Sequence, residues 1–140
     1  MKIKEIQEEI IDEFAFFDDW MQRYEHMIAL GKSLPLIEEK NKTEDYLIKG
    51  CQSKVWVFPE LIDGKVVYSA DSDAIITKGI VALLLRVFSN QTPEKILQAD
   101  TKFIDEIGLK EHLSPTRANG LVSMIKQLKM YALAYQSQLN

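Results

Sequence analysis

The chain has 140 residues, a length typical of one domain, and we expect a single domain over residues 1–140. Apolar residues make up 46% and charged residues 27%, a balance that suits a globular protein with one hydrophobic core. Seventeen Lys and Arg stand against twenty-one Asp and Glu, so the formal net charge is −4. This acidic balance argues against a general nucleic-acid binder, which needs a strongly cationic surface.

The single cysteine, Cys51, excludes further classes of protein. One cysteine forms no intramolecular disulfide and does not supply the Cys-rich ligand set of a zinc or iron–sulfur site. The acidic N-terminus lacks the apolar core of a signal peptide. The most apolar stretch, residues 80–88, is interrupted by Arg86 and is far shorter than the ~20 residues of a membrane span. We therefore expect a soluble, cytoplasmic protein.

Charge is distributed unevenly along the chain. Residues 1–25 carry three basic and eight acidic side chains, a net charge of −5. Residues 110–140 carry four basic and one acidic side chain, a net charge of +3. These segments are either two solvated helix faces of opposite sign or, for one of them, a face that docks a partner.

The first 30 residues predict helical structure with a bend near residues 16–18. We expect Asp18 to cap the second helix and Gly31 to end it, and we expect residues 32–45 to form an irregular surface connection. The apolar residues that recur at helical spacing are Ile3, Ile6, Ile10, Phe14, Phe17, Trp20, Tyr24, Met27 and Ile28.

The middle of the chain predicts a β-hairpin. Residues 55–58 and 66–68 are β-branched and aromatic, and Asp63-Gly64 between them is a turn signal. Pro59 donates no hydrogen bond to a strand ladder, so the first strand should be an edge strand or should end there.

Helical signals return after the hairpin. Asp73 is expected to cap a buried helix over residues 75–88, and Thr92-Pro93 and Ser114-Pro115 each open a later helix. The pattern predicts an α+β fold, a small antiparallel sheet of about three strands with helices packed around it. The apolar stripe of the final helix consists of Ala118, Leu121, Ile125, Leu128, Ala132 and Tyr135.

Cys51 lies in a segment that favours reactivity. Gly50 permits a tight turn of positive φ just before the thiol, and the cations of Lys49 and Lys54 favour the thiolate. Gln52 and Ser53 add polar groups that can hydrogen-bond a sulfur anion. The alternative is a buried, inert cysteine, the commonest fate of a free cysteine in a protein.

Three motifs resemble the SufE/CsdE family of sulfur acceptors, which work with cysteine desulfurases. The first is Gly-Cys-Gln-Ser-Lys-Val-Trp at residues 50–56, which resembles the active-cysteine motif. The second is Ala-Asp-Ser-Asp-Ala at residues 70–74 with Lys78-Gly79, and the third covers residues 112–121 with Met124 one turn later. The resemblance spans essentially the full chain and implies a SufE/IscU-like fold.

This resemblance implies that Cys51 accepts persulfide sulfur from a SufS/CsdA-like cysteine desulfurase, stimulates that enzyme and passes the sulfur to an iron–sulfur scaffold. Pyridoxal phosphate belongs to the desulfurase, and the acceptor has no cofactor or metal of its own. The acceptor is expected to be a monomer or a weak homodimer. Ile48, Val55 and Trp56 are expected to shelter the persulfide, and the absence of a second cysteine means that sulfur must leave through another protein.

Other polar residues are candidate contacts. Arg117 is poorly placed for the dipole of its own helix, so its partner is either Asp71 or Asp73 or a group on the desulfurase. An alternative function is a thiol enzyme in which His112 acts as the base for Cys51. An iron–sulfur scaffold or zinc protein is close to excluded, since His26 and His112 are the only histidines.

Overall fold

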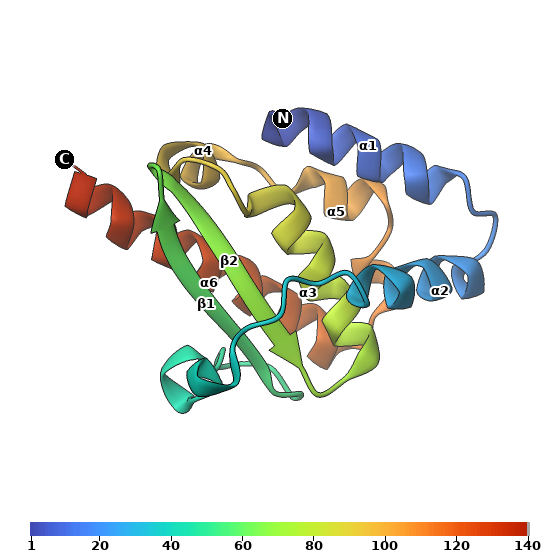
Figure 1. Ribbon diagram of the computed structural model, residues 1–140. Coiled ribbons are helices and arrows are strands. Elements are labelled where there is room, and N and C mark those ends of the chain that lie inside the picture. Colours follow the sequence, from blue (N-terminus) through green and yellow to red (C-terminus); the bar gives the residue numbers. More distant parts are fainter. Residues whose placement is uncertain (140) are drawn as a thin grey trace.

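The computed structural model describes residues 1–139, which form six α-helices, one β-hairpin and three short 3-10 turns (Figure 1). Helices and hairpin confirm the predicted α+β class. The elements in chain order are α1 (Ile3–Ala15), α2 (Trp20–Gly31), η1 (Glu39–Asn41), η2 (Glu44–Tyr46), β1 (Val55–Ile62), β2 (Lys65–Ser72), α3 (Ile75–Phe88), α4 (Pro93–Gln98), α5 (Lys102–Glu106), η3 (Lys110–His112) and α6 (Pro115–Leu139).

The hairpin is a regular antiparallel pair. Val55 lies opposite Ser72 and Ile62 lies opposite Lys65, so β1 and β2 are in register over their full length. The turn residues Asp63 and Gly64 have φ of 52° and 79°. Positive φ at both central residues is what a tight hairpin turn requires, and the Asp-Gly signal in the sequence is therefore confirmed.

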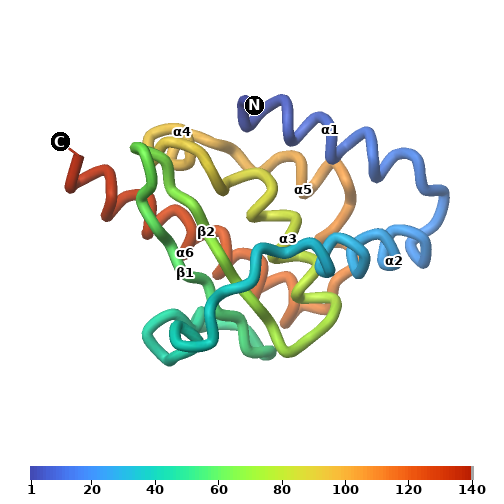
Figure 2. Tube along the Cα trace, in the orientation of Figure 1, coloured from blue at the N-terminus to red at the C-terminus, as the bar shows by residue number. Residues whose placement is uncertain are grey.

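The sheet of the described residues has two strands, not about three. The segment between α2 and β1 runs along both edges of the hairpin, as Figure 2 traces, but it pairs only through single-residue bridges. Leu36 bridges to Ala70 of β2, and Leu47 bridges to Trp56 of β1. Between these bridges the polar residues of η1 and η2 turn the chain away, so neither bridge extends into a strand.

Helix α6 crosses one face of the hairpin and is tied to it by two tyrosines. The buried Tyr68 hydroxyl donates to the Leu128 carbonyl at 2.6 Å, and the Tyr135 hydroxyl donates to the Pro59 carbonyl at 3.2 Å. Pro59 lies within β1 on an edge strand, one of the two positions predicted for it. These bonds fix where the C-terminal half of α6 lies relative to the middle of the hairpin.

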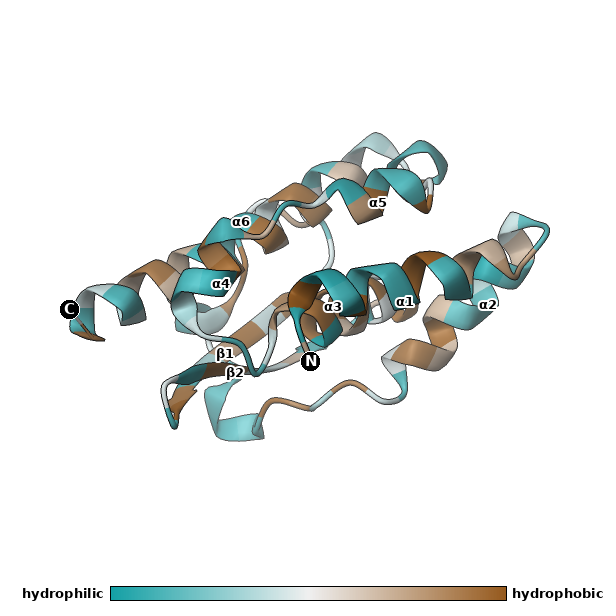
Figure 3. Ribbon diagram, turned by 90° about the horizontal axis from the view of Figure 1, so that it is seen from above, coloured by the Kyte–Doolittle hydropathy of each residue, from teal (hydrophilic) through white to brown (hydrophobic). Residues whose placement is uncertain are grey.

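Helix α3 lies at the centre of the molecule and contacts α1, α2, α6 and β2. Most of its side chains are buried, and the apolar colouring in Figure 3 is concentrated where the helices face one another. Despite this apolar helix, none of the helices within residues 1–139 has both the length and the apolar character of a membrane span.

Helix caps follow the predictions in part. Thr92 and Ser114 cap α4 and α6 through hydroxyl oxygens that accept from the amides of Lys95 and Arg117. The cap of α2 is Asp19, one residue after the predicted Asp18, and it accepts from the Gln22 amide at 2.8 Å. The predicted cap of α3, Asp73, is engaged elsewhere, and Ala74 occupies the capping position without a side-chain bond.

Two glycines let α2 and α3 approach backbone to backbone. A Cβ on Gly79 would lie 2.2 Å from the Met27 carbonyl oxygen, and a Cβ on Gly31 would lie 3.1 Å from the Gly79 nitrogen. Gly31 is the last residue of α2 and Lys32, in the right-handed region, caps the helix, so the predicted role of Gly31 as the cap was wrong. Its absent side chain serves packing instead.

Gly79→Ala should therefore destabilise the protein. Helix propensity alone would favour alanine by about 1 kcal/mol, but the clash with the Met27 carbonyl forces the helices apart, and we expect a net loss of about 2 kcal/mol in the free energy of unfolding. Urea denaturation measures this loss. Gly31→Ala is the matched control in the same contact and should cost less; an unchanged or raised midpoint for Gly79→Ala would show that the close approach is not structural.

Candidate functional site

Cys51 lies on a loop whose two ends are fixed. The Ile48 amide donates to the Val55 carbonyl at 2.8 Å. The Lys54 amide donates to the Asp73 carboxylate at 3.0 Å, and the Asp73 amide donates back to the Lys54 carbonyl at 3.2 Å. Residues 49–53 are thus a short loop, held at its base by the hairpin and by the turn that precedes α3.

Gly50 is required in this loop for two reasons. Its φ of 91° lies in the region that side chains disfavour, as the sequence predicted. In addition, a Cβ on Gly50 would lie 2.6 Å from the Ser123 Oγ of α6. The turn before the cysteine is therefore pressed against α6, and no other residue fits there without displacement.

The Cys51 thiol points at α6. Its Sγ donates to the Gly120 carbonyl at 3.6 Å, and a Cβ on Gly120 would lie only 3.4 Å from Sγ. The residue is half-buried, and burial raises the pKa of the Cys51 thiol. The expectation that Lys49 and Lys54 favour the thiolate was wrong for this conformation, because both side chains are exposed and burial is the only cause of the shift.

A hollow of about 70 Å³ adjoins the thiol. Its walls combine the cysteine loop with one face of α6 and the first turns of α3. Thr77 and Ile80 of α3, and Thr116, Gly120 and Met124 of α6, are spaced three or four residues apart, as one face of a helix requires. The sequence shows this spacing, but only the folded position of the loop shows that these faces meet at Cys51. The lining residues are Cys51, Gln52, Ser53, Thr77, Ile80, Thr116, Arg117, Gly120 and Met124.

The residues that we expected to shelter the sulfur do not line this hollow. Ile48 and Val55 are buried in the main core, and the Trp56 ring lies 5.6 Å from the Lys42 ammonium. The strand side chains beside the motif serve the sheet instead. The apolar side chains beside the thiol are instead Ile80 of α3 and Met124 of α6, and both are distant from Cys51 in sequence.

Asp71 and Asp73 have different positions. Asp71, at the end of β2, pairs with Lys42 at 2.6 Å and with Lys78 at 3.3 Å. Burial alone would raise the pKa of Asp71, but hydrogen bonds from Lys42, the Ser72 amide and Lys78 together hold it below its usual value. Asp73 holds the base of the cysteine loop through Lys54. Asp71 thus links β2 to α3 and to the segment that carries Lys42, whereas Asp73 holds the base of the loop that carries Cys51.

Arg117 lies in the first turn of α6 beside Cys51. It lines the hollow, its side chain is exposed, and within residues 1–139 no carboxylate lies within ion-pair distance of it. The internal pair with Asp71 or Asp73 does not form, since Asp71 pairs with lysines and Asp73 with a backbone amide. The guanidinium is therefore presented to solvent at the mouth of the hollow.

His112 is engaged away from the thiol. Its ring stacks on Trp20 with centroids 3.8 Å apart, and its Nδ1 lies 3.1 Å from the Gly108 carbonyl oxygen. The thiol's hydrogen bond goes to Gly120 rather than to a histidine nitrogen, and His112 does not line the hollow. The nucleophile–base pair of a thiol enzyme is absent from this arrangement.

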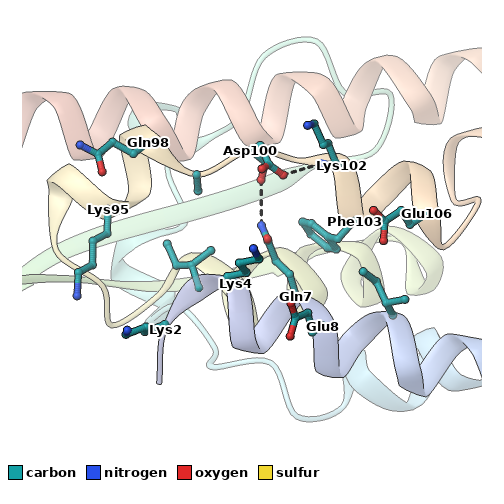
Figure 4. Close-up of a pocket in the computed structure, with 13 residues that line it drawn as sticks. Lys2, Lys4, Gln7, Glu8, Lys95, Gln98, Asp100, Lys102, Phe103 and Glu106 are labelled. Atoms are coloured by element: carbon teal, nitrogen blue, oxygen red, sulfur yellow. Dashed lines mark hydrogen bonds between the residues drawn. The ribbon is translucent and has the colours of Figure 1, made fainter.

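A larger hollow of about 580 Å³ lies between α1, α4 and α5 and shares no lining residue with the Cys51 hollow (Figure 4). The Gln7 side chain crosses it to donate to the Asp100 carbonyl at 2.9 Å. Its lining includes four lysines but no Cys, Ser, Thr or His, and we assign it no chemistry. Within the described part of the chain, no three His, Cys, Asp or Glu side chains gather as a metal site would require.

Alkylation of Cys51 should show the effect of burial. Because burial raises the pKa of the thiol, the pH at which iodoacetamide reacts at half its maximal rate should be higher in the folded protein than in the urea-unfolded chain. The thiol is neutral below both midpoints, so folding is favoured there, and that contribution to stability is lost as pH rises through the folded value. A folded midpoint at or below the unfolded one would contradict this environment.

Comparison with known proteins places most of the chain in one family. Residues 8–132 match the family model SufE, described as an Fe-S metabolism associated domain. An uncharacterized SufE-like protein of Rhizobium meliloti is 42% identical over 130 residues, which cover 89% of this chain and 93% of the relative. One of Synechocystis is 38% identical over 127 residues, covering 91% and 80%.

The fold has a solved counterpart. The solution structure of a hypothetical protein from Thermus thermophilus superposes with a TM-score of 0.79 at 19% identity, over 94% of this chain and 96% of that one. This likeness bears on the fold, and the sequence matches bear on the family. The chain therefore belongs to the SufE family, whose domain is associated with iron–sulfur metabolism.

Proposed function

We propose that this protein accepts sulfur from a cysteine desulfurase onto Cys51 as a persulfide, stimulates the desulfurase, and passes the sulfur on to iron–sulfur cluster assembly. The observation that carries the proposal is the position of the chain's one thiol. It lies on a glycine turn, beside a small hollow walled by two helices, in a chain of the SufE family.

The chemistry is a transfer between two thiols. The Cys51 thiolate attacks the outer sulfur of the desulfurase persulfide and forms a new sulfur–sulfur bond. The bond between the two sulfurs of the desulfurase breaks, and its cysteine leaves as a thiolate. One thiolate is consumed and one is produced, so the step needs no external oxidant or reductant.

The way the loop is held would allow Cys51 to move away from α6. In the position that the structure describes, Sγ faces α6 and burial raises the pKa of the thiol, which lowers the fraction of thiolate. Apart from the hydrogen bond of the thiol to the Gly120 carbonyl, the bonds that fix the loop lie at its base, at Ile48–Val55 and Lys54–Asp73. We assign the approach to the desulfurase to an outward swing of the loop about Gly50, after which the loaded sulfur returns to the hollow.

The remaining site residues have supporting roles in this proposal. Gln52 and Ser53 line the hollow from the loop side and offer polar groups to the sulfur. Asp71 and Asp73 hold the loop's surroundings in place. Arg117, which the fold leaves exposed, contacts a group on the desulfurase.

The proposal includes no cofactor in this chain, which acts as one domain over residues 1–140. Pyridoxal phosphate is placed in the SufS/CsdA-like desulfurase, and the downstream partner is an iron–sulfur scaffold complex. We assign the reaction to the cytoplasm, with the acceptor as a monomer or weak homodimer. The activity is that of a carrier and activator rather than of a stand-alone enzyme.

Cys51→Ser should abolish both loading and stimulation. Incubation of the wild-type protein with a SufS/CsdA-like desulfurase and cysteine should add the mass of one sulfur atom at Cys51, measured by intact-mass spectrometry, and should increase sulfide release. The serine variant should gain no sulfur, because the chain has no second thiol.

The double variant Cys51→Ser/Ser137→Cys is a matched control, since it moves the only thiol to the exposed end of α6. It should neither load at the wild-type rate nor stimulate. Stimulation that survives in Cys51→Ser would indicate an interaction module without sulfur chemistry. A wild-type Cys51 that gains no sulfur would overturn the proposal.

A further inference from the structure

Thr77 is a buried hydroxyl residue at the Cys51 hollow. It lies in the first turn of α3, only 5% of its surface is exposed, and it is among the residues that line the hollow. No hydrogen bond of its hydroxyl is found within residues 1–139, and its oxygen is not among the fully enclosed polar atoms that lack a partner, so solvent still reaches it. A hydroxyl that solvent reaches, in a side chain otherwise buried at the hollow, is free to donate to a group placed there.

Few of the other lining residues can donate a hydrogen bond inside the hollow. Ile80 and Met124 are apolar, and the Gly120 carbonyl is an acceptor that the thiol already occupies. Gln52, Thr116 and Arg117 belong to the exposed surface at its mouth. Ser53, on the cysteine loop, is half-buried, so Thr77 carries the one buried hydroxyl among the lining residues.

The hollow has room for one more atom of sulfur. Its volume of about 70 Å³ exceeds the ~30 Å³ that a water molecule occupies in the liquid. A Cβ at position 120 would lie 3.4 Å from Sγ, so glycine there leaves this space open. A persulfide is more acidic than a thiol, and its outer sulfur carries negative charge at neutral pH. Such an anion among apolar walls requires a hydrogen-bond donor.

We propose that the Thr77 hydroxyl donates a hydrogen bond to the outer sulfur of the Cys51 persulfide and so acts as its positioning residue. The inference rests on the proposed function, because it presupposes that Cys51 carries sulfur. The location of Thr77 adds to the effect. The first turn of α3 carries the positive end of the helix dipole, and Ala74 at the capping position offers no side chain to neutralise it.

The test compares the wild type with Thr77→Val and Thr77→Ser after loading by the desulfurase and cysteine, followed by removal of the desulfurase. Valine keeps the shape of threonine and removes the donor, whereas serine keeps the donor. Two quantities are measured by intact-mass spectrometry: the pH at half-maximal alkylation of the outer sulfur by iodoacetamide, and the half-life of the persulfide in dithiothreitol. Thr101→Val, a substitution of the same kind outside the hollow at a position with no side-chain capping bond, is the matched control.

We expect Thr77→Val to raise the alkylation midpoint by about one pH unit and to shorten the half-life about tenfold, the effect of one lost hydrogen bond to a charged group. Thr77→Ser and Thr101→Val should behave as the wild type. The midpoint of the unloaded thiol should change little in Thr77→Val, because that thiol donates to Gly120 instead. A merely structural role for Thr77 would shift the loaded and unloaded midpoints together.

Two outcomes separate the inference from the proposed function. If the wild type loads and Thr77→Val matches it in midpoint and half-life, the role of Thr77 is wrong while sulfur acceptance stands. If Cys51 of the wild type gains no sulfur, the proposed function fails and the inference fails with it. Should Thr77→Val unfold, the comparison of Thr77→Ser with Thr77→Ala decides, since only serine should preserve the wild-type midpoint.

Discussion

The cysteine loop lies against α6 because neither Gly50 nor Gly120 has a Cβ. A side chain at position 50 would collide with Ser123, and one at position 120 would crowd the Cys51 sulfur. This one contact determines where the thiol lies, which carbonyl it meets and which helices wall its hollow. The rest of the fold holds the two partners of this contact in place, with α6 tied to the hairpin by Tyr68 and Tyr135 and the loop base tied to the turn before α3.

The consequence is a cysteine in a protected state. Its pKa is raised by burial, its hydrogen bond goes to a backbone carbonyl, and the lysines beside it in sequence are directed to solvent. A persulfide exposed to solution would lose its outer sulfur to a reductant, so a protected cysteine suits the proposed carrier better than a permanently activated one. In the proposed mechanism the position of the loop controls reactivity, because the thiol reaches its partner when the loop leaves α6.

How much the sequence could predict depended on the range of the interaction. The Asp63-Gly64 hairpin, the buried helix after it and the caps at Thr92 and Ser114 are local features, and all are confirmed. The turn at Gly50 is local as well. The role of Asp73 was missed because its carboxylate bonds to Lys54, a residue that only the hairpin brings beside it. The local sequence around Asp73 predicts a helix cap and does not show that Lys54 takes up its carboxylate instead.

The hollow was beyond prediction for the same reason. Thr77, Ile80, Gly120 and Met124 lie on two helices whose faces are apparent from periodicity, but their meeting point at Cys51 depends on the backbone approach that Gly50 permits. The prediction of a third strand was wrong for a different reason. The bridges at Leu36 and Leu47 involve only one residue each, and the polar segment between them turns away from the sheet.

The central claim is that sulfur on Cys51 stays protected until a second protein takes it, because the chain has no other cysteine to expel it. The most direct test loads the protein with radioactive sulfur from labelled cysteine, removes the desulfurase, and follows the label with and without an added iron–sulfur scaffold. The account predicts that the label stays on the isolated protein and moves to the scaffold when it is added. Release of the label as free sulfide at the same rate with or without the scaffold would contradict it.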